Sequence, residues 1–221
     1  SCLMGPNCLR IAEELCVKAH LPLKMRVLDL GCGKGLTSMF LAEAYQASVV
    51  AADLWIDPTE NYERFRECGW DKSIFPLNVE AHAMPFARGY FDAVLSIDAY
   101  HYFGADEGYL SEHLLPCLRK DALILISVPG LKKDFDNGIP EELKPFWQQD
   151  MHFHSAKWWR ELLAKEEDVT VYFCGDLDCH YQAWDDWLRT DNPHALEDRK
   201  MIRAEGGRYF STVGIVARKR A

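Results

Sequence analysis

Apolar positions recur along this chain with two different spacings, which indicates alternating strands and helices. Short, nearly continuous runs of Val, Ile, Leu and Ala are typical of strands covered on both faces of a sheet. Pro76 interrupts one such run, so that strand is expected near a sheet edge. We expect strands over residues 27–30, 48–53, 74–80, 91–96, 122–128, 168–174 and 209–216.

Helices are expected ahead of the first strand and in most of the intervals that follow. Apolar residues three and four positions apart predict them over residues 7–20, 36–45, 57–68, 107–119 and 155–165, with a helical segment within 178–207. Asn7 and Ser155 begin two of these segments as N-cap residues. Strands that alternate with helices favour an α/β domain on a mostly parallel sheet.

The composition of the chain argues against a nucleic-acid-binding or membrane-spanning protein. The 221 residues are 48% hydrophobic, which suits one domain over residues 1–221 with a sizeable core. The net charge is −9 and no basic run of five or more residues occurs, so we expect no nucleic-acid partner and favour small uncharged or cationic substrates. No apolar run approaches the ~20 residues of a membrane span, and no signal-peptide pattern opens the chain.

Cysteine and histidine spacing gives no sign of a metal site. The eight cysteines include no C-x-x-C pair, so reduced thiols in the cytoplasm are expected rather than disulfides or zinc. His152 and His154 alternate as two ligands can, but no third ligand stands near them in the sequence. We predict a cytoplasmic protein without a metal.

A turn with glycines at alternate positions follows the first expected strand. Gly31, Gly33 and Gly35 precede a helical segment that begins at Leu36. Glycine adopts positive φ and has no Cβ atom, so the backbone can lie against a ligand, while the helix N-terminus offers N–H groups to an anion. The turn predicts a ligand with a carboxylate or phosphate and a flat ring.

Two acidic residues frame this turn. Asp29 stands two positions before the first glycine, and Asp53 closes the next apolar run, where a carboxylate can hold the hydroxyls of a nucleotide ribose. The dinucleotide motif G-x-G-x-x-G would need glycine at the position of Leu36, which weakens the alternative of an NAD-type oxidoreductase.

The stretch DLGCGKG at positions 29–35, together with Asp53, resembles the first two motifs of the class I S-adenosylmethionine-dependent methyltransferases. A second match covers residues 80–96, with an acidic and a small residue, a Met-Pro-Phe step and a following strand. The likeness is nearest to the ubiquinone/menaquinone-biosynthesis type of small-molecule enzymes. It implies a doubly wound, mostly parallel seven-stranded sheet with an antiparallel last strand.

The resemblance also implies roles for individual residues. Glu80 would accept a hydrogen bond from the adenine amino group, and the Ala81 amide would donate to a ring nitrogen. From their place just beyond the second strand, where open α/β sheets bind ligands, Leu54 and Trp55 are candidates for the floor of the adenine ring, with a core position as the alternative for Trp55. The cofactor-binding residues expected in total are Asp29, Gly31, Cys32, Gly33, Asp53, Leu54, Glu80, Ala81 and Asp98.

Asp98 and His101 follow the fourth expected strand at the mouth of the cleft. This is where the resemblance places contacts to the methionine part of the cofactor. His101 titrates near neutrality and is our candidate catalytic residue, as an acceptor of a proton from the nucleophile. A packing role for its ring is the alternative.

The chain divides into three expected parts. Residues 1–24 hold an N-terminal helix, residues 25–130 the cofactor-binding core, and residues 131–221 a substrate-side half. Residues 131–153 predict a rim loop. The insertion at 178–207 carries Trp184 and Trp187 on one helical face, which covers the cleft or packs the insertion on the core.

We therefore expect S-adenosylmethionine-dependent transfer of a methyl group to a small-molecule acceptor by in-line displacement. Besides the oxidoreductase, a protein that binds the cofactor without turnover remains an alternative.

Overall fold

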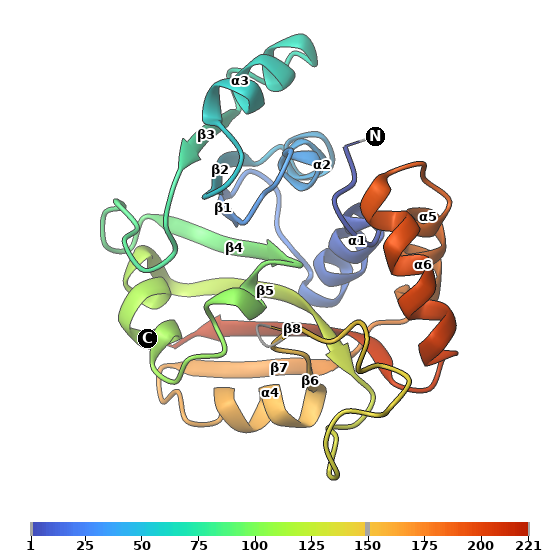
Figure 1. Cartoon of the computed structure of the whole chain (residues 1–221). Helices are drawn as coiled ribbons and strands as arrows, with labels where there is room; N and C mark the ends of the chain where they lie inside the picture. Colours follow the sequence, from blue (N-terminus) through green and yellow to red (C-terminus); the bar gives the residue numbers. More distant parts are fainter. Residues whose placement is uncertain (1, 149–150, 221) are drawn as a thin grey trace.

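The computed structural model describes residues 2–148 and 151–220, and these form one twisted sheet with helices on both faces (Figure 1). The strand order is β3-β2-β1-β4-β5-β8-β7, and the two-residue β6 pairs with β5. The strands are β1 Arg26–Leu30, β2 Ser48–Asp53, β3 Ile74–Asn78, β4 Phe91–Ile97, β5 Leu118–Leu131, β6 His154–Ser155, β7 Val169–Asp176 and β8 Phe210–Lys219.

The direction of the strands confirms the predicted doubly wound sheet. β1 pairs in parallel with both β2 and β4, and only β8 runs antiparallel, to β5 and to β7. The chain therefore leaves β1 in one direction through β2 and β3 and returns to its other side with β4. At such a switch point the carboxyl ends of neighbouring strands leave a crevice for a ligand. β3, which contains Pro76, is an edge strand as expected.

Six α-helices and three short helical turns occur in the described residues. The helices are α1 Cys8–Ala19, α2 Leu36–Tyr45, α3 Pro58–Glu67, α4 Ala156–Leu163, α5 His180–Leu188 and α6 Pro193–Glu205, and the turns are η1 Tyr100–Tyr102, η2 Leu110–Leu114 and η3 Leu115–Cys117. The Asn7 and Ser155 side chains accept from backbone N–H groups at the starts of α1 and α4, which confirms both predicted caps. None of the helices in the described ranges is long and apolar enough to cross a membrane.

The two faces of the sheet bury separate cores. α1, α2 and α3 cover one face, where Leu15, Leu41 and Phe65 are fully buried. α4 and the turns η2 and η3 cover the other, around Trp159 and Leu114. Strands between two such layers are apolar on both sides, which accounts for their continuous apolar runs.

The prediction of one regular amphipathic helix over residues 107–119 is wrong, because the helical part is shorter and is not an α-helix. The structure has a π-turn and a 3-10 turn there, and β5 begins at Leu118. Gly108 takes a positive φ of 88° and Pro116 lacks an N–H group, so a regular α-helix has little room between them. The side chains predicted to face inward are nevertheless buried, namely Tyr109, Leu110, Leu114, Leu115 and Leu118.

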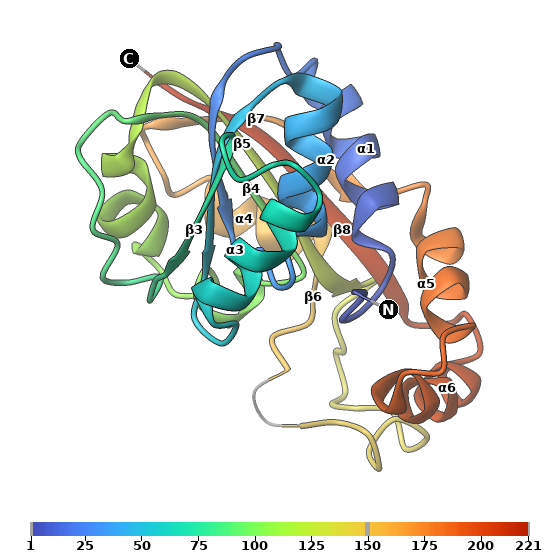
Figure 2. The same ribbon diagram turned by 90° about the horizontal axis from the view of Figure 1, so that it is seen from above.

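A third, smaller core joins the rim loop to the insertion. Leu131 and Leu143 from the loop side are buried against Met201 of α6 and Phe210 of β8. α5 and α6 lie together beside the loop that follows β5 (Figure 2). Of the predicted tryptophan stripe, Trp187 is fully buried. The insertion thus packs on the core and also extends past the carboxyl end of β5.

Candidate functional site

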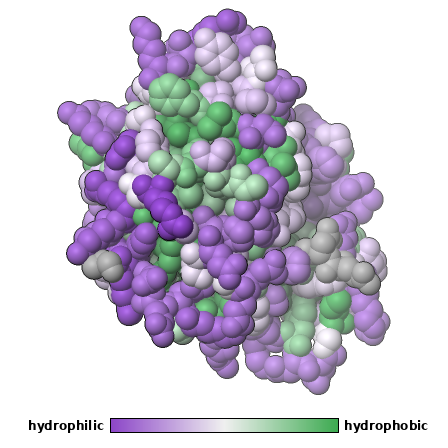
Figure 3. All heavy atoms as spheres, turned by 90° about the vertical axis from the view of Figure 1, so that its left-hand side faces the viewer, coloured by the Kyte–Doolittle hydropathy of each residue, from purple (hydrophilic) through white to green (hydrophobic). Residues whose placement is uncertain are grey.

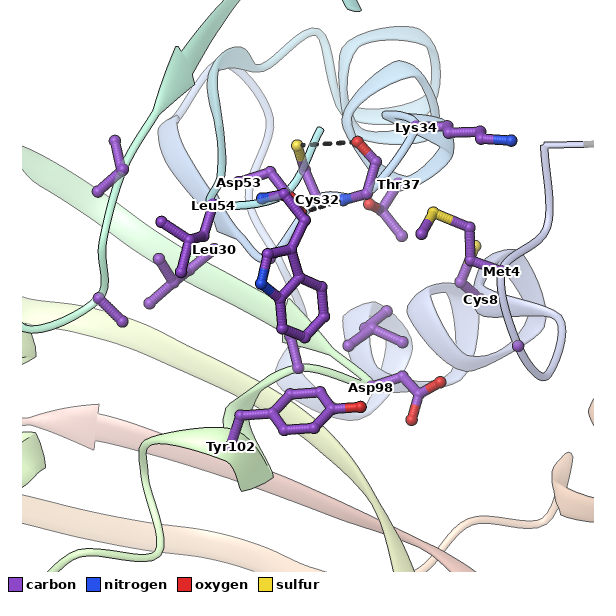
Figure 4. Close-up of a pocket in the computed structure, with 18 of the residues that line it drawn as sticks. Met4, Cys8, Leu30, Cys32, Lys34, Thr37, Asp53, Leu54, Asp98 and Tyr102 are labelled. Atoms are coloured by element: carbon purple, nitrogen blue, oxygen red, sulfur yellow. Dashed lines mark hydrogen bonds between the residues drawn. The ribbon is translucent and has the colours of Figure 1, made fainter. Parts of the chain in front are cut away.

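A cavity of about 410 Å³ opens at the carboxyl ends of β1, β2 and β4 (Figure 4). The glycine turn, the segment after β2, the segment after β3 and the N-terminal residues form its walls. Its lining includes the expected residues Gly31, Cys32, Gly33, Asp53, Leu54, Glu80, Ala81 and Asp98. The structure thus brings together eight of the nine predicted cofactor residues.

The glycine turn takes a shape that other residues cannot adopt. Gly31, Gly33 and Gly35 have φ values of 78°, 52° and 78°. A Cβ atom on Gly31 would lie 2.2 Å from the Cβ atom of Ala99, and one on Gly35 would lie 2.4 Å from the Phe65 ring. The turn is therefore held against β4 and α3 in a conformation that leaves its backbone facing the cavity.

Asp29, the ninth predicted residue, lies behind the cavity wall and does not line it. Its carboxylate accepts hydrogen bonds of 2.6 Å from the hydroxyls of Thr37 and Ser38 in the first turn of α2. Burial raises its pKa to about 6, against the opposing effect of these two hydroxyls. Asp29 therefore positions the glycine turn between β1 and α2, and the structure gives it no direct access to a ligand.

Asp53 fixes the turn from the end of β2. Its Oδ2 accepts from the Gly33 N–H at 2.8 Å, and its Oδ1 accepts from the N–H groups of Trp55 at 2.8 Å and Ile56 at 3.0 Å. A carboxylate has about four acceptor positions, so these three bonds leave room for about one more. That position is available to a ligand hydroxyl because Asp53 lines the cavity.

Asn61 on α3 is a positioning residue that the sequence reasoning missed. It is 1% exposed, and its Nδ2 donates to the Gly33 carbonyl at 2.9 Å and contacts the Cys32 sulfur at 3.8 Å. Its Oδ1 accepts from Arg64. An asparagine on a helix face that otherwise packs inward was the available signal, because a buried amide requires partners.

Apolar side chains stand at the cavity mouth. Leu54 lines the cavity, and Trp55, which is 69% exposed, meets Tyr102 edge-on at a ring-centroid distance of 5.3 Å. Phe75 and Leu77 of β3 are also exposed. The molecular face on the side of β3 shows apolar residues gathered in its upper half, framed by polar ones (Figure 3). Trp55 is therefore a surface residue of the mouth and not part of the core.

Glu80 and Ala81 form the wall that follows β3. The Glu80 carboxylate accepts from the His82 N–H at 3.0 Å and lies 2.9 Å from the His82 ring nitrogen, and these contacts lower its pKa. The Ala81 carbonyl accepts from the Tyr109 hydroxyl at 3.2 Å. An ionised carboxylate and a fixed backbone segment thus stand side by side at the cavity wall.

Asp98 closes β4 in a strained backbone conformation. Its φ is +56°, which is uncommon for a residue other than glycine. A Cβ atom on Gly5 would lie 2.5 Å from its Oδ2, so the N-terminal segment passes directly over the carboxylate. Burial, and then the charge of Asp198, raise the pKa of Asp98 to about 7. Figure 4 shows its side chain on the side of the cavity where Met4 and Tyr102 lie.

His101 does not line this cavity but a smaller one of about 180 Å³ beside it. The ring is 4% exposed, and burial lowers its pKa to about 4, so it is neutral at pH 7. Its Nδ1 has no hydrogen-bond partner within the described residues. The residues that line both cavities are Met4, Gly5, Pro6, Asp98 and Tyr102.

A family model matches the segment of the chain that contributes most of the strands around the larger cavity. Residues 27–120 match the family model described as "Methyltransferase domain". A malonyl-[acyl-carrier protein] O-methyltransferase of Legionella pneumophila is 36% identical over 78 residues, which make up 35% of this chain and 27% of that protein. The match thus spans about a quarter of the length of this curated relative.

Similar solved structures share the fold over almost the whole chain. The phosphoethanolamine N-methyltransferase 2 of Haemonchus contortus, solved with S-adenosyl-L-methionine, has a TM-score of 0.78 at 15% identity, covering 100% of this chain and 55% of that one. The geranyl diphosphate C-methyltransferase of Streptomyces coelicolor, solved with S-adenosyl-L-homocysteine, has a TM-score of 0.75 at 16% identity, covering 95% and 79%. The [4+2]-cyclase SpnF has a TM-score of 0.76 at 14% identity, covering 100% and 88%.

These relatives carry names of several different substrates, so the finer likeness to the ubiquinone/menaquinone group stays a prediction. The expected family, Rossmann-like fold and cofactor are confirmed. Residues 27–120 match the methyltransferase domain model, and the whole chain shares the fold of methyltransferases solved with S-adenosyl-L-methionine or S-adenosyl-L-homocysteine.

Proposed function

We propose that this protein transfers the methyl group of S-adenosylmethionine to a small-molecule acceptor by in-line displacement. The observation that carries the proposal is the glycine cradle, in which Gly31 and Gly33, both with positive φ and no side chain, line a cavity of about 410 Å³. Backbone that approaches a cavity this closely, at the N-terminus of α2, suits a nucleoside with an attached carboxylate.

The cofactor-binding roles follow from where each side chain stands. Asp53 holds a ribose hydroxyl through its remaining acceptor position, and Glu80 accepts from the adenine amino group. The Ala81 amide donates to a ring nitrogen, and Leu54 packs on the ring. Backbone groups of Gly31, Cys32, Gly33 and Asp98 contact the methionine part. Residues 1–221 act as one methyltransferase domain, since all described strands lie in one sheet.

The residues of the protein mainly have to position the two reactants. The cofactor supplies a methyl group bonded to a positively charged sulfur. After the transfer, this sulfur departs as part of a neutral thioether. The acceptor atom must be held about 3 Å from that methyl group, in line with the departing sulfur. His101, with a pKa of about 4, is a weak base near pH 7, so we assign it a hydrogen bond to the acceptor as its main role, with proton uptake second.

Calorimetric titration with S-adenosylhomocysteine tests the cofactor site. We expect binding in the micromolar range, and Asp53→Ala should weaken it by more than about tenfold, the loss of one charge-assisted hydrogen bond. Asp106→Ala, an exposed carboxylate that lines neither cavity, is the matched control and should bind as the wild type does. Absence of binding heat from the intact protein would overturn the proposal.

Binding of the cofactor without methyl transfer is the second candidate, because a [4+2]-cyclase shares this fold. The two are separated by incubating the protein with methyl-labelled S-adenosylmethionine and a deproteinised metabolite extract. We expect label in a small molecule, and the Asp53→Ala variant should lose it. Cofactor binding without transferred label would favour the second candidate.

The acceptor and the compartment are part of the same proposal. The net charge of −9 and the carboxylates of the cavity walls oppose a nucleic-acid partner and favour a small molecule. A cytoplasmic location is supported by the eight cysteines, all of which are free thiols.

A further inference from the structure

The smaller cavity beside the cofactor cavity has walls from three distant parts of the chain. They are the N-terminal segment, the end of β4 with η1, and the rim loop together with α5 and α6. Most of the side chains are apolar or aromatic, including Met151, Phe153, Trp184 and Met201. Such a wall selects ligands with an apolar surface and a few polar groups.

Two carboxylates stand in this apolar wall. Asp98 comes from β4, and Asp198 from α6, where the Trp187 indole N–H donates to its Oδ2 at 2.8 Å. No lysine or arginine within residues 2–148 and 151–220 forms an ion pair with either carboxylate. Burial is the main cause of the raised pKa of both groups, and the charge of Asp198 adds to the shift of Asp98. Two ionised carboxylates in an apolar wall cost free energy unless a positive charge pairs with them.

A buried histidine completes the wall of this cavity beside the two carboxylates. His101 lines it, is 4% exposed, and has an Nδ1 atom without a hydrogen-bond partner in the described part of the chain. That Nδ1 atom itself has almost no accessible surface, so it lies behind the cavity surface and the rest of the ring faces the cavity. His101 is neutral at pH 7, so it does not repel a cation.

Asp98 lies at the boundary because it lines both cavities. A group bound to it would stand between the cofactor cavity and the smaller one. The rings of Tyr102, Phe153 and Trp184 in the wall add surfaces that attract a cation. The net charge of −9 favours the approach of a positively charged ligand.

We propose that the methyl acceptor is an amine, bound as a cation between Asp98 and Asp198 in the smaller cavity, with its apolar part against Trp184 and Met201. The inference rests on the proposed methyl transfer and names its substrate class. A protonated primary or secondary amine first gives a proton to the Asp98 carboxylate. Its lone pair then forms the nitrogen–carbon bond while the methyl–sulfur bond breaks, and sulfur keeps that electron pair.

The test compares a compact cation with its neutral isostere in protein saturated with S-adenosylhomocysteine. Choline and 3,3-dimethylbutan-1-ol have the same shape and differ in the charged nitrogen. Calorimetry should give a dissociation constant for choline about tenfold or more below that of the alcohol. Equal affinities, or no binding of choline, would overturn the proposal.

Two variants locate the effect. Asp98→Asn and Asp198→Asn should each weaken choline binding by about tenfold and leave the alcohol unchanged, because only the charge is removed. Asp191→Asn, an exposed carboxylate of the same insertion that lines neither cavity, should change neither affinity. Thermal unfolding of each variant checks that it is folded.

The titration with S-adenosylhomocysteine separates failure of this inference from failure of the proposed function. If the cofactor product binds and choline shows no preference, the amine acceptor is wrong and the cofactor site stands. If Asp98→Asn weakens only the cofactor product, and Asp198→Asn has no effect, then Asp98 serves the cofactor and the amine site is refuted.

Discussion

The two cavities of this protein share Asp98 but are built in different ways. The larger one is formed by the N-terminal residues and by segments that directly follow β1, β2, β3 and β4. Its polar groups are bonded to the backbone around them, as Asp53 is to Gly33. The smaller one joins the N-terminal segment to α6, and it leaves His101 Nδ1 unpaired within the described residues.

The difference shows where each site gets its specificity. The cofactor side is completed by its own hydrogen bonds before any ligand arrives, so it can present a fixed shape to one cofactor. The smaller cavity is bordered by carboxylates from two distant elements that no lysine or arginine of the described residues pairs. Changes to the first should therefore reduce stability and cofactor affinity together, whereas changes to the second should leave cofactor affinity intact.

The largest effect is expected for Gly31→Ala. Positive φ costs about 1–2 kcal/mol, and the contact with Ala99 adds about 1–3 kcal/mol of overpacking, together about 100-fold in affinity for S-adenosylhomocysteine. Gly69→Ala is the control, since Gly69 has a φ of 79° but no atom within 4 Å of its would-be Cβ. Calorimetry should find wild-type affinity in the control, and equal losses in both variants would show that crowding at Ala99 is irrelevant.

Asp29→Asn should change the pH dependence of stability. Because the pKa of Asp29 is raised to about 6 in the folded protein, its contribution is present below its ordinary pKa of 3.8 and is lost as pH rises through about 6. The difference approaches about 3 kcal/mol over this window. Denaturant unfolding between pH 4 and pH 7 should show a steeper slope in the wild type than in the variant, which keeps the raised pKa of Asp98, and parallel profiles would contradict the assignment.

Asn61→Ala should weaken the same turn less. It leaves the Gly33 carbonyl without its amide partner, at a cost of about 1–3 kcal/mol in the free energy of unfolding, and it should weaken S-adenosylhomocysteine binding severalfold. Asn137→Ala, at an exposed loop position, is the control and should be neutral. Unchanged cofactor affinity in Asn61→Ala would mean that α3 does not position the turn.

The smallest effect is expected for His101→Phe on the acceptor side. Removing an unpaired buried polar atom should raise the free energy of unfolding by about 1 kcal/mol, because no hydrogen bond is lost. The affinity for S-adenosylhomocysteine should stay within about twofold, since His101 does not line the larger cavity. A marked loss of stability or of cofactor affinity would show that the ring belongs to the cofactor side.

Prediction from the sequence was wrong where contacts with neighbouring residues determine the conformation or the bonding of a segment. Residues 107–119 repeat apolar residues at helical spacing, yet Gly108 and Pro116 limit them to short turns. Asp29 fits a cofactor motif, but the hydroxyls of Thr37 and Ser38 occupy its carboxylate beneath the cavity. Each outcome depended on contacts that spacing alone does not contain.

The sequence by itself determined the sheet, the glycine turn and the acids at the strand ends, because these depend on backbone conformation and on neighbours a few residues apart. Only the tertiary structure decided that Asn61 braces the turn and that Asp98 and Asp198 share one apolar cavity. Those residues lie far apart in the chain, and the packing of α3 on the turn and of α6 on the ends of β5 and β8 brings them together. The proposed cofactor site is therefore recognisable from the chain, while the proposed amine site depends on the folded protein.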